Sequence, residues 1–590
     1  MHRESGSNRG IFRRLAAAVA AVASAMIAGA ATAASQTPTE SQAPAELALL
    51  HGRIHTEDGQ RSVAQAIALR GNAIIAVGTD EAIGALFGPQ TRIIDLQGRV
   101  VLPGIIDAHT HPAESAQDQG KCDLGDRMLG TAAVKAKVAA CLRKSSGDSS
   151  SWFEAVQVNP SGLTLTLADL DSLAATRPLI LNGSDGHTVW ANSAALTAAH
   201  ITAATKEPRG GRIERDAAGN PTGTLRDDAT DLVLDALPGT DLEHEAAQLA
   251  RALDAMRATG ITSVQDASVD EHLMQIYKRL YDQHRLDMRV RGCFHLQDLH
   301  EPAQSLIDRA IAFRSRWAID PDFLRADAVK IFADGVIEYP SQTAALLEPY
   351  LDGHGRPTSN RGPSYFTQDN LNRIVSGADA AGLTVHVHAI GDRAVRGALD
   401  AFAYSRQHNG AVDGRDQIAH LELIDPADFA RFKELGVIAN FQLLWAERED
   451  YIVKSTLPYI GPERARYLYP ARSLREAGAR IAGGSDWDVS SFDAFEAMEH
   501  AITRAQARGK PPLLPEQSIT IQDAVDAYTI NAAFALKQER TTGSLEPGKR
   551  ADLIVLDRDV FTIDPRDLHE TRVLQTYLDG RLVYGNPGAP

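Results

Sequence analysis

The chain of 590 residues has little cysteine, few aromatic residues and no excess of positive charge. Its three cysteines are too few for a disulfide-built scaffold or for a zinc cluster held by cysteine. The formal net charge of −16 argues against a nucleic-acid or anionic-membrane partner. Hydrophobic residues make up 44% and charged residues 23%, which excludes wholesale disorder. What remains is a large, acidic, soluble globular protein.

An alanine-rich apolar run begins at Leu15, follows four arginines and ends at Ala31-Thr32-Ala33. Basic, apolar and small residues in this order predict a signal peptide over 1–33 and a periplasmic or secreted protein. A retained membrane anchor is the alternative, although the run is short and is followed by polar residues. We interpret those residues, 34–45, as a linker. The Arg13-Arg14 pair leaves twin-arginine export open beside the general route.

Both ends of the remaining chain have the character of β-hairpins. Over 46–98, short apolar runs are separated by the turn signals Asp58-Gly59 and Gly71-Asn72. Over 536–590, similar runs surround Asp579-Gly580. Because neither end is large enough to bury a core alone, we predict one small β-sandwich assembled from both.

Between these ends, over 99–535, strand-like and helix-like segments alternate, which is typical of a parallel (β/α)₈ barrel of the α/β class. An open doubly wound sheet is the alternative. The stretch 112–260 is too long for one crossover, so we predict an inserted subdomain at about 113–258, after the first barrel strand. The eight predicted strands are 99–109, 261–268, 288–296, 324–334, 383–390, 417–421, 437–444 and 480–485.

His109 and His111 lie two residues apart at the end of the first predicted strand. In a strand their imidazoles point to the same face, and such a pair supplies two converging ligands to a metal ion. Two hydrogen-bonded structural histidines are the alternative for this pair taken alone.

Further metal-competent residues lie in other predicted strands. Lys330 sits in an apolar run, where a buried ammonium is costly unless it is paired or chemically altered. His388, His420 and Asp486 each lie at or just after the end of a strand. Because the strand ends of a parallel barrel open on one face, we expect these residues to meet the histidine pair there. His386 shares the face of His388 but lies deeper, where we expect a supporting residue.

In this chain order the candidate residues resemble the metal site of the amidohydrolase superfamily. Shorter strings narrow the resemblance to the amidohydrolase-3 branch, which includes YtcJ-like proteins and N-substituted formamide deformylases. These strings are Asp185-Gly-His187, Asn192-Ser193, Gly210-Gly211, Pro221-Thr-Gly223, 329–335, 388–392 and Gly484-Ser-Asp-Trp487.

The resemblance implies one or two divalent metal ions, with zinc suited to the ligand types and manganese or iron as the alternatives. A carboxylated Lys330 would bridge the two metals, and Asp486 would be the catalytic acid/base. The implied metal ligands are His109, His111, Lys330, His388 and His420.

Residues near this predicted site are candidates for recognising the substrate. His187, Arg415 and Trp487 are candidate substrate-binding residues, and the long loop 338–365 is a candidate lid. The structural alternatives are a hydrogen-bonding role for His187, a helix cap for Arg415 and core packing for Trp487. The chain departs from the family pattern at Asp488, where proline is usual, and at Val336, where a small polar residue is usual. Both departures concern the choice of substrate more than the metal chemistry.

The predicted function is an exported metal-dependent amidohydrolase that cleaves a C–N bond of an amide, formamide or related small molecule. Metal-activated hydroxide would attack, and Asp486 would transfer the proton. The same site acting on an ester, lactone or cyclic imide is the first alternative. A non-catalytic binding protein is the second, and it would predict the loss of a ligand, which the sequence does not show. We expect no nucleic-acid partner and no membrane partner after signal cleavage; a homodimer is left open.

The three cysteines divide into a spaced pair and a single residue. Cys122 and Cys141 can form a disulfide in an oxidising compartment, while two buried thiols are the alternative. Cys293 is expected to be free on the third barrel strand.

Overall fold

A computed structural model of the chain describes residues 43–118, 120–145, 151–161, 163–239, 241–298 and 300–587. The predicted signal peptide at 1–33 and all but the end of the predicted linker lie outside the described residues. The described residues from Pro44 onward belong to one compact unit. Among them, none of the helices combines the length and the apolar composition that crossing a membrane requires.

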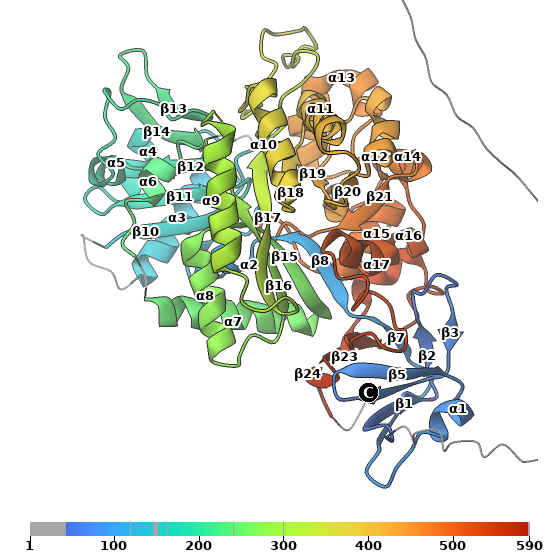
Figure 1. The fold of residues 1–590 in the computed structure, drawn as a ribbon. Coiled ribbons are helices and arrows are strands. Elements are labelled where there is room, and N and C mark those ends of the chain that lie inside the picture. The colour runs from blue at the N-terminus through green and yellow to red at the C-terminus, as the bar shows by residue number, and fades with distance from the viewer. Residues whose placement is uncertain are drawn as a thin grey trace, which may run out of the picture. The chain divides into compact units, whose positions relative to one another are not determined.

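An eight-stranded parallel sheet forms the centre of this unit (Figure 1). Neighbouring strands follow chain order without reversal, which confirms the barrel fold of the α/β class and excludes the doubly wound alternative. The Asp486 amide donates to the His109 carbonyl at 2.7 Å and so links the last strand to the first. The strands are β8 (Ile105–Thr110), β15 (Ile261–Val269), β16 (Arg289–His295), β17 (Leu324–Phe332), β18 (Thr384–Ala389), β19 (Gln417–His420), β20 (Ile438–Phe441) and β21 (Arg480–Gly483).

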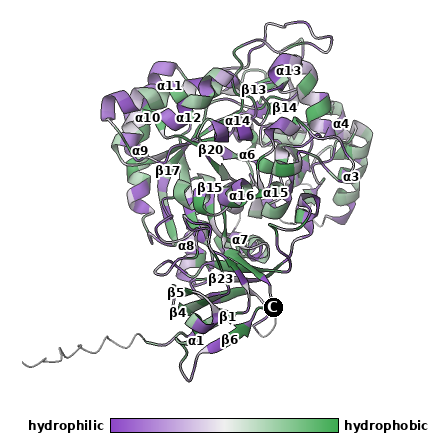
Figure 2. Cartoon of the chain, turned by 90° about the vertical axis from the view of Figure 1, so that its right-hand side faces the viewer, coloured by the Kyte–Doolittle hydropathy of each residue, from purple (hydrophilic) through white to green (hydrophobic). Residues whose placement is uncertain are grey.

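Amphipathic helices surround the sheet. In α8 (Glu271–Asp282), the Asp270 side chain caps the first turn by accepting from the Leu273 amide at 2.8 Å. Its buried residues recur with helical spacing and pack into the same core as the barrel strands. Figure 2 shows the central strands as mainly hydrophobic and the outer helices with hydrophilic faces. The other helices of this layer are α7 (Leu242–Ala258), α9 (Ala303–Arg316), α10 (Gln368–Ala380), α11 (Asp392–Asn409), α12 (Phe429–Leu435) and α15 (Ala494–Thr503).

A subdomain with its own six-stranded sheet is inserted between β8 and α7. Two small hydrophobic cores cover this sheet. A disulfide between Cys122 and Cys141 joins its edge strand to helix α3 (Thr131–Lys144), which resolves the cysteine question; Cys293 is free and buried. In sheet order the strands are β13 (Gly211–Arg215), β14 (Pro221–Asp227), β12 (Thr188–Ala191), β11 (Leu179–Gly183), β10 (Phe153–Val158) and β9 (Cys122–Asp123).

Two further sheets pack together, one built from N-terminal strands alone and one that combines strands from the N-terminal and C-terminal parts of the described chain. Strand β7 (Val100–Pro103) pairs antiparallel with β22 (Leu553–Leu556), so the blue and red strands of Figure 1 lie side by side. The core between the sheets takes residues from both parts, including Leu49 and Ile54 from one and Val555 from the other. Neither part encloses this core alone. The remaining strands are β1 (Leu47–Leu50), β2 (Arg53–His55), β3 (Val63–Ala64), β4 (Ala66–Arg70), β5 (Ala73–Gly78), β6 (Arg92–Asp95), β23 (Val573–Leu578) and β24 (Arg581–Gly585).

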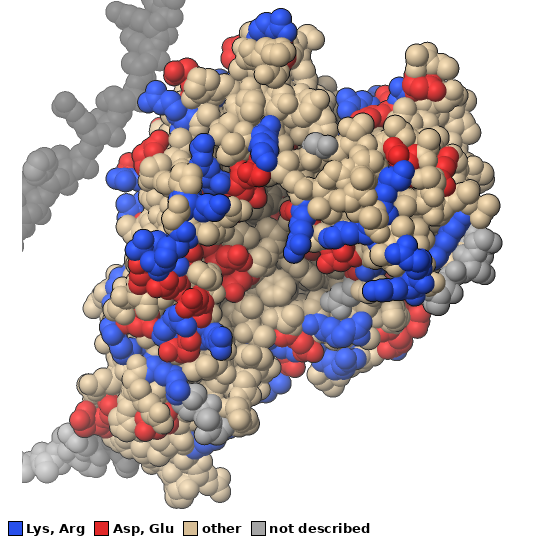
Figure 3. Space-filling view, turned by 180° about the vertical axis from the view of Figure 1, so that it is seen from behind, with Lys and Arg blue, Asp and Glu red and all other residues tan. Residues whose placement is uncertain are grey.

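Long segments after β17 and β20 pack against each other beyond the carboxyl ends of the strands. Ile337 and Tyr350 from the first share a hydrophobic cluster with Ile452 and Leu468 from the second. The Tyr339 amide also donates to Ser455, at 2.8 Å. These segments therefore form a packed cover on the side of the barrel where the candidate site lies. On the molecular face in Figure 3, acidic and basic side chains are interspersed, with no extended patch of one sign.

Candidate metal centre

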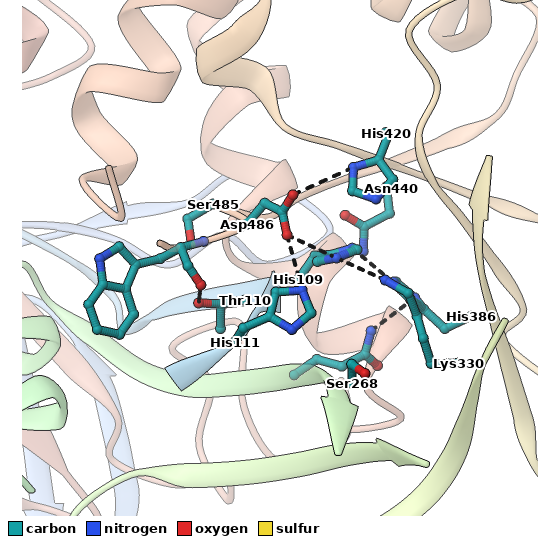
Figure 4. A network of polar contacts seen from close by, with 12 residues as sticks. His109, Thr110, His111, Ser268, Lys330, His386, His420, Asn440, Ser485 and Asp486 are labelled. Carbon is teal, nitrogen blue, oxygen red and sulfur yellow. Dashed lines mark hydrogen bonds and ion pairs between the residues drawn. The ribbon is translucent and has the colours of Figure 1, made fainter. Parts of the chain in front are cut away.

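Asp486 lies at the meeting point of the candidate histidines (Figure 4). One carboxylate oxygen, Oδ1, is 3.3 Å from His109 Nε2 and 3.1 Å from His111 Nε2. The other, Oδ2, is 3.8 Å from His420 Nδ1. Ligand atoms of His109, His420 and Asp486 all lie within 4.8 Å of one another. Residues almost 400 positions apart thus meet, because β8, β19 and β21 end at the same face of the barrel.

Lys330 approaches the same cluster from β17. Its Nζ lies 3.3 Å from His109 Nε2 and 4.5 Å from the centre of the Phe332 ring. The side chain is only 1% exposed, and burial lowers the pKa of its amine to about 8. No carboxylate pairs with this ammonium among the described residues, so a neutral or chemically altered nitrogen suits the position.

His388 occupies the neighbouring side of the cluster. Its ring centre lies 4.4 Å from that of His420, and its Nε2 is 3.1 Å from the Gly335 carbonyl. His187 of the subdomain reaches the same place, with its ring centre 5.5 Å from that of His388. The Asp227 carboxylate holds His187 at 2.8 Å from Nδ1 and so fixes the orientation of the ring. The insertion therefore contributes a wall to the site.

The side chains of two predicted substrate-binding residues make structural contacts. Arg415 precedes β19, at the opposite end from His420, and its guanidinium binds the Phe534 carbonyl and Glu539, each at 2.8 Å. Of the two alternatives for Arg415, substrate contact and a structural cap, these contacts agree with the structural one. Trp487 packs its indole on Phe492 and against the barrel core, while its carbonyl accepts from the His111 amide at 2.9 Å. Trp487 thus positions His111 through its backbone.

Trp445 lines the site. Its indole stacks on His420, with ring centres 5.5 Å apart and planes 6° apart. Trp152 and Trp190 belong to the hydrophobic clusters of the subdomain.

His386 belongs to a layer of polar side chains beneath the cluster, and the amide side chains of this layer were not predicted from the sequence. His386 Nε2 lies 2.9 Å from His109 Nδ1, which places the other nitrogen of His109 toward Asp486 and Lys330. Gln265 and Asn440 each donate to the Ala108 carbonyl at 2.9 Å, and Gln417 accepts from Asn440 at 2.9 Å. The sequence feature that could have indicated these residues is an amide side chain within an otherwise apolar strand. Such residues need partners when buried, and here the partners hold the histidine strand in place.

The electrostatics of the cluster favour an ionised Asp486 and neutral imidazoles at His109 and His420, whereas contact with Asp486 raises the pKa of His111 although burial opposes it. Although burial opposes it, His109, His111 and His420 hold the pKa of Asp486 well below its usual value. Burial, together with Lys330, lowers the pKa of His109 to about 3. Burial also holds the pKa of His420 well below its usual range. Neutral imidazole and ionised carboxylate are the protonation states that bind a metal ion.

The residues present fit a divalent cation. Both ring nitrogens of His420 and Nδ1 of His111 are buried without a hydrogen-bond partner in the described chain. A buried polar atom without a partner is costly, and a metal ion would remove that cost. The donors are imidazole nitrogen and carboxylate oxygen, the ligand types that zinc takes.

Comparisons with known proteins agree with this arrangement. The model of the "Amidohydrolase family" matches residues 92–584. N-substituted formamide deformylase from Arthrobacter pascens is 30% identical over 92% of this chain and 99% of its own length. The putative amidohydrolase YtcJ from Bacillus subtilis is 28% identical over 91% of this chain and 99% of its own.

Solved structures agree on the fold. An uncharacterized metal-dependent hydrolase from Pyrococcus horikoshii superimposes with a TM-score of 0.69 at 22% identity, covering 88% of this chain and 99% of the other. The barrel carries a His/His/Asp cluster at the ends of its strands, and the family model matches most of the length of the chain. The chain belongs to the amidohydrolase family, and it is a hydrolase that acts on carbon–nitrogen bonds.

Proposed function

We propose that this chain is an exported enzyme that hydrolyses the C–N bond of a small amide or N-substituted formamide, using one or two zinc ions. The observation that carries the proposal is the Asp486 carboxylate, which contacts His109 and His111 with one oxygen and faces His420 with the other. The relative named as an N-substituted formamide deformylase supports the substrate class.

When bound, a divalent cation lowers the pKa of water and polarises a substrate carbonyl. The chain itself must then move a proton and hold the substrate. Asp486 is ionised and buried, so one of its oxygens accepts a proton and returns it to the departing nitrogen. His187, fixed by Asp227 beside His388, contacts the substrate from the subdomain side.

Lys330 is proposed to carry a carbamate. The Lys330 ammonium would first lose one proton, and the neutral amine would then add carbon dioxide, form an N–C bond and release a second proton, which exchanges a buried cation for an anion with two oxygen atoms. Lys330→Ala should therefore lower metal content and activity together, as measured by elemental analysis and turnover. Lys433→Ala, which changes an exposed lysine, is the control. Full occupancy of two metals in Lys330→Ala would exclude the bridge.

A substrate panel tests the proposed function. The metal-loaded enzyme is given N-alkylformamides, matched acetamides, and an ester, a lactone and a cyclic imide of similar size. We expect amine release from a formamide or acetamide at a kcat/KM at least tenfold above that for the other bonds. Preferential hydrolysis of the ester or lactone would overturn the C–N assignment, whereas a preference for the cyclic imide, whose ring opens at a C–N bond, would overturn only the amide or formamide substrate class.

Export is a separate part of the proposal and has its own measurement. N-terminal sequencing of protein recovered from the periplasm or medium should begin near Ala34, as the order of residues in 1–33 indicates. An intact Met1 in exported material would contradict it.

A further inference from the structure

Gln157 of the subdomain has a backbone conformation that is unusual for a residue in a strand. It lies in β10, and its φ of 55° is in the left-handed region that residues other than glycine rarely adopt. Between Ala155 and Val158 the pairing of β10 with β11 advances by one more residue in β10 than in β11, so Gln157 occupies a β-bulge. Bulges next to active sites often re-aim a side chain. The bulge therefore takes the Gln157 side chain out of the regular alternation of the strand.

The Gln157 side chain contacts one residue of the barrel in two places. Its amide nitrogen Nε2 donates to the Asp488 carbonyl at 2.9 Å and to the Asp488 carboxylate oxygen Oδ2, also at 2.9 Å. Asp488 follows β21 and lies two residues after Asp486. A side-chain amide has two protons to donate, and Asp488 offers an acceptor for each. The contact therefore fixes both the backbone and the side chain of Asp488.

The other carboxylate oxygen of Asp488 faces the helix that follows His111. Ser115, 4% exposed, lies in this helix, α2 (Pro112–Ser115). Its Oγ is 2.9 Å from Asp488 Oδ1, and a longer contact of 3.3 Å leads to the Trp487 carbonyl. The Ser115 amide donates to the His111 carbonyl at 2.9 Å. Hydrogen bonds thus run from the subdomain through Asp488 to the start of α2, and we call Gln157, Asp488 and Ser115 the clamp.

The clamp adjoins the metal centre through the backbone on both sides of Asp488. The carbonyl of Trp487, directly before it, accepts from the His111 amide at 2.9 Å. The amide of Val489, directly after it, donates to the Asp486 carbonyl at 2.8 Å. His111 Nε2 and Asp486 Oδ1 are themselves 3.1 Å apart (Figure 4). Asp488 is therefore the point where the subdomain reaches the segment that carries Asp486.

On the subdomain side, the clamp holds the sheet that carries His187. Strand β12 begins directly after His187, and in the sheet it lies between β14 and the β11–β10 pair. Arg226 of β14 donates to Ser341 of the loop after β17 at 3.1 Å. Polar links from β10 and from β14 therefore attach the sheet to the barrel on both sides of β12. Between these links, the His187 ring lies 5.5 Å from that of His388, centre to centre.

We propose that Gln157 and Asp488 are positioning residues, which hold the substrate wall of the subdomain against the metal centre. Neither side chain has to touch the substrate, because the clamp acts through His187 on one side and the Asp486 segment on the other. The inference rests on the proposed C–N hydrolysis and names residues that set the geometry of the same site.

The first test removes the donor. Gln157→Leu keeps a side chain of similar size but cannot donate, so the wall is released and KM should rise by about fivefold or more, the scale of a lost hydrogen bond to a charged group. The Asp486 amide remains bonded to His109, so kcat should stay within about threefold and metal content should be unchanged. Kinetics on the amide or formamide that the wild type hydrolyses, with elemental analysis, measure these effects. An unchanged KM would overturn the proposal.

A double-mutant cycle shows whether the two residues act together. In an Asp488→Ala background, Gln157→Leu should raise KM by a factor at least about twofold smaller than in the wild type, because one of its two acceptors is already gone. The same factor in both backgrounds would overturn the clamp. Arg212→Leu, which changes an exposed side chain in β13 of the same sheet, should keep the wild-type KM.

Hydrogen–deuterium exchange separates this proposal from the proposed function, since it needs no turnover. In the metal-loaded enzyme, Gln157→Leu should raise exchange over 485–490, the barrel segment that Gln157 contacts through Asp488. Arg212→Leu should leave exchange there as in the wild type. Unchanged exchange over 485–490 in Gln157→Leu would overturn the proposal. Raised exchange together with absence of C–N hydrolysis by the wild type would refute the proposed function alone.

Discussion

At the scale of single residues, the site places side chains where the backbone is strained. Asp486 and His420 have φ of 55° and 74°, and Leu421 follows with 55°. Residues without glycine's freedom rarely adopt this left-handed region, which costs about 1–3 kcal/mol per residue, and such residues cluster at active sites. The hydrogen bond from the Asp486 amide to His109 helps to hold that conformation. The geometry of the carboxylate is therefore imposed by the fold.

Asp486→Asn tests the role of this carboxylate. The amide keeps the shape but cannot accept the proton, so we expect turnover to fall by about 10²-fold or more. Folding and most of the metal content should remain, as measured by circular dichroism and elemental analysis. Asp450→Asn, which alters a mostly exposed residue paired with Lys454, should behave as wild type. Near-normal turnover in Asp486→Asn would mean that another group moves the proton.

At the scale of elements, the junction of β8 and β21 sets the distance between His109 and Asp486. Asp107 accepts from the amides of His109 and Ser485, at 3.2 Å and 3.0 Å. A Cβ added to Gly484 would lie 2.5 Å from His109 Cβ and 2.6 Å from its backbone nitrogen. Only glycine allows the two segments to approach this closely.

Gly484→Ala should therefore damage both stability and the metal site. Overpacking of this kind costs about 1–3 kcal/mol, and separation of the strands would weaken metal binding. Chemical denaturation and metal titration measure the two effects. Gly59→Ala adds a methyl group where nothing lies within 4 Å and should change neither. Wild-type metal affinity in Gly484→Ala would show that the junction tolerates the extra carbon.

The disulfide lies within the subdomain, so we expect it to stabilise that part of the chain. Cys122 and Cys141 are 19 residues apart, and closing a loop of that size stabilises a fold by about 3 kcal/mol. The Cys122→Ala/Cys141→Ala variant should lose that amount from the subdomain transition and become sensitive to proteolysis there. Reduction should destabilise the wild type similarly and leave the variant unchanged. Equal stability before and after reduction of the wild type would contradict this.

At the scale of the whole described molecule, a buried ionic contact joins the barrel to the two-sheet part. Arg289 of β16 donates to the Asp552 carboxylate at 2.7 Å and 3.1 Å and also pairs with Asp579. Both Arg289 and Asp552 are buried. The barrel is thus connected to strands from the far end of the chain through a charge pair that excludes water.

Asp552→Ala should be strongly destabilising. It leaves the buried guanidinium with part of its charge uncompensated, and breaking such a pair costs about 3–5 kcal/mol. Asp287→Ala removes a more exposed partner, that of Arg581, and should cost about 1 kcal/mol or less. Urea denaturation of both variants makes the comparison. Similar losses of unfolding free energy in the two variants would show that the buried pair stabilises the fold no more than the exposed pair does.

Much of the architecture follows from local pattern in the sequence. Alternating strand and helix periods predicted the barrel, and His109, Lys330, His388, His420 and Asp486 were found because strand ends of a parallel barrel share one face. The short runs at both ends predicted paired sheets, because each end was too small to bury a core. These inferences need only periodicity, chain order and the chemistry of metal ligands.

Other features depend on which surfaces meet in three dimensions. Arg415 and His420 belong to one short segment, yet β19 carries them to opposite ends of the barrel. His187 of the subdomain lies beside His388 of the barrel, and no sequence spacing indicates that they are neighbours. The same holds for the amide layer under His109. The sequence by itself determined the fold class and the candidate ligands, whereas the tertiary structure decided the supporting contacts and the substrate side, because long-range packing places side chains that local pattern cannot relate.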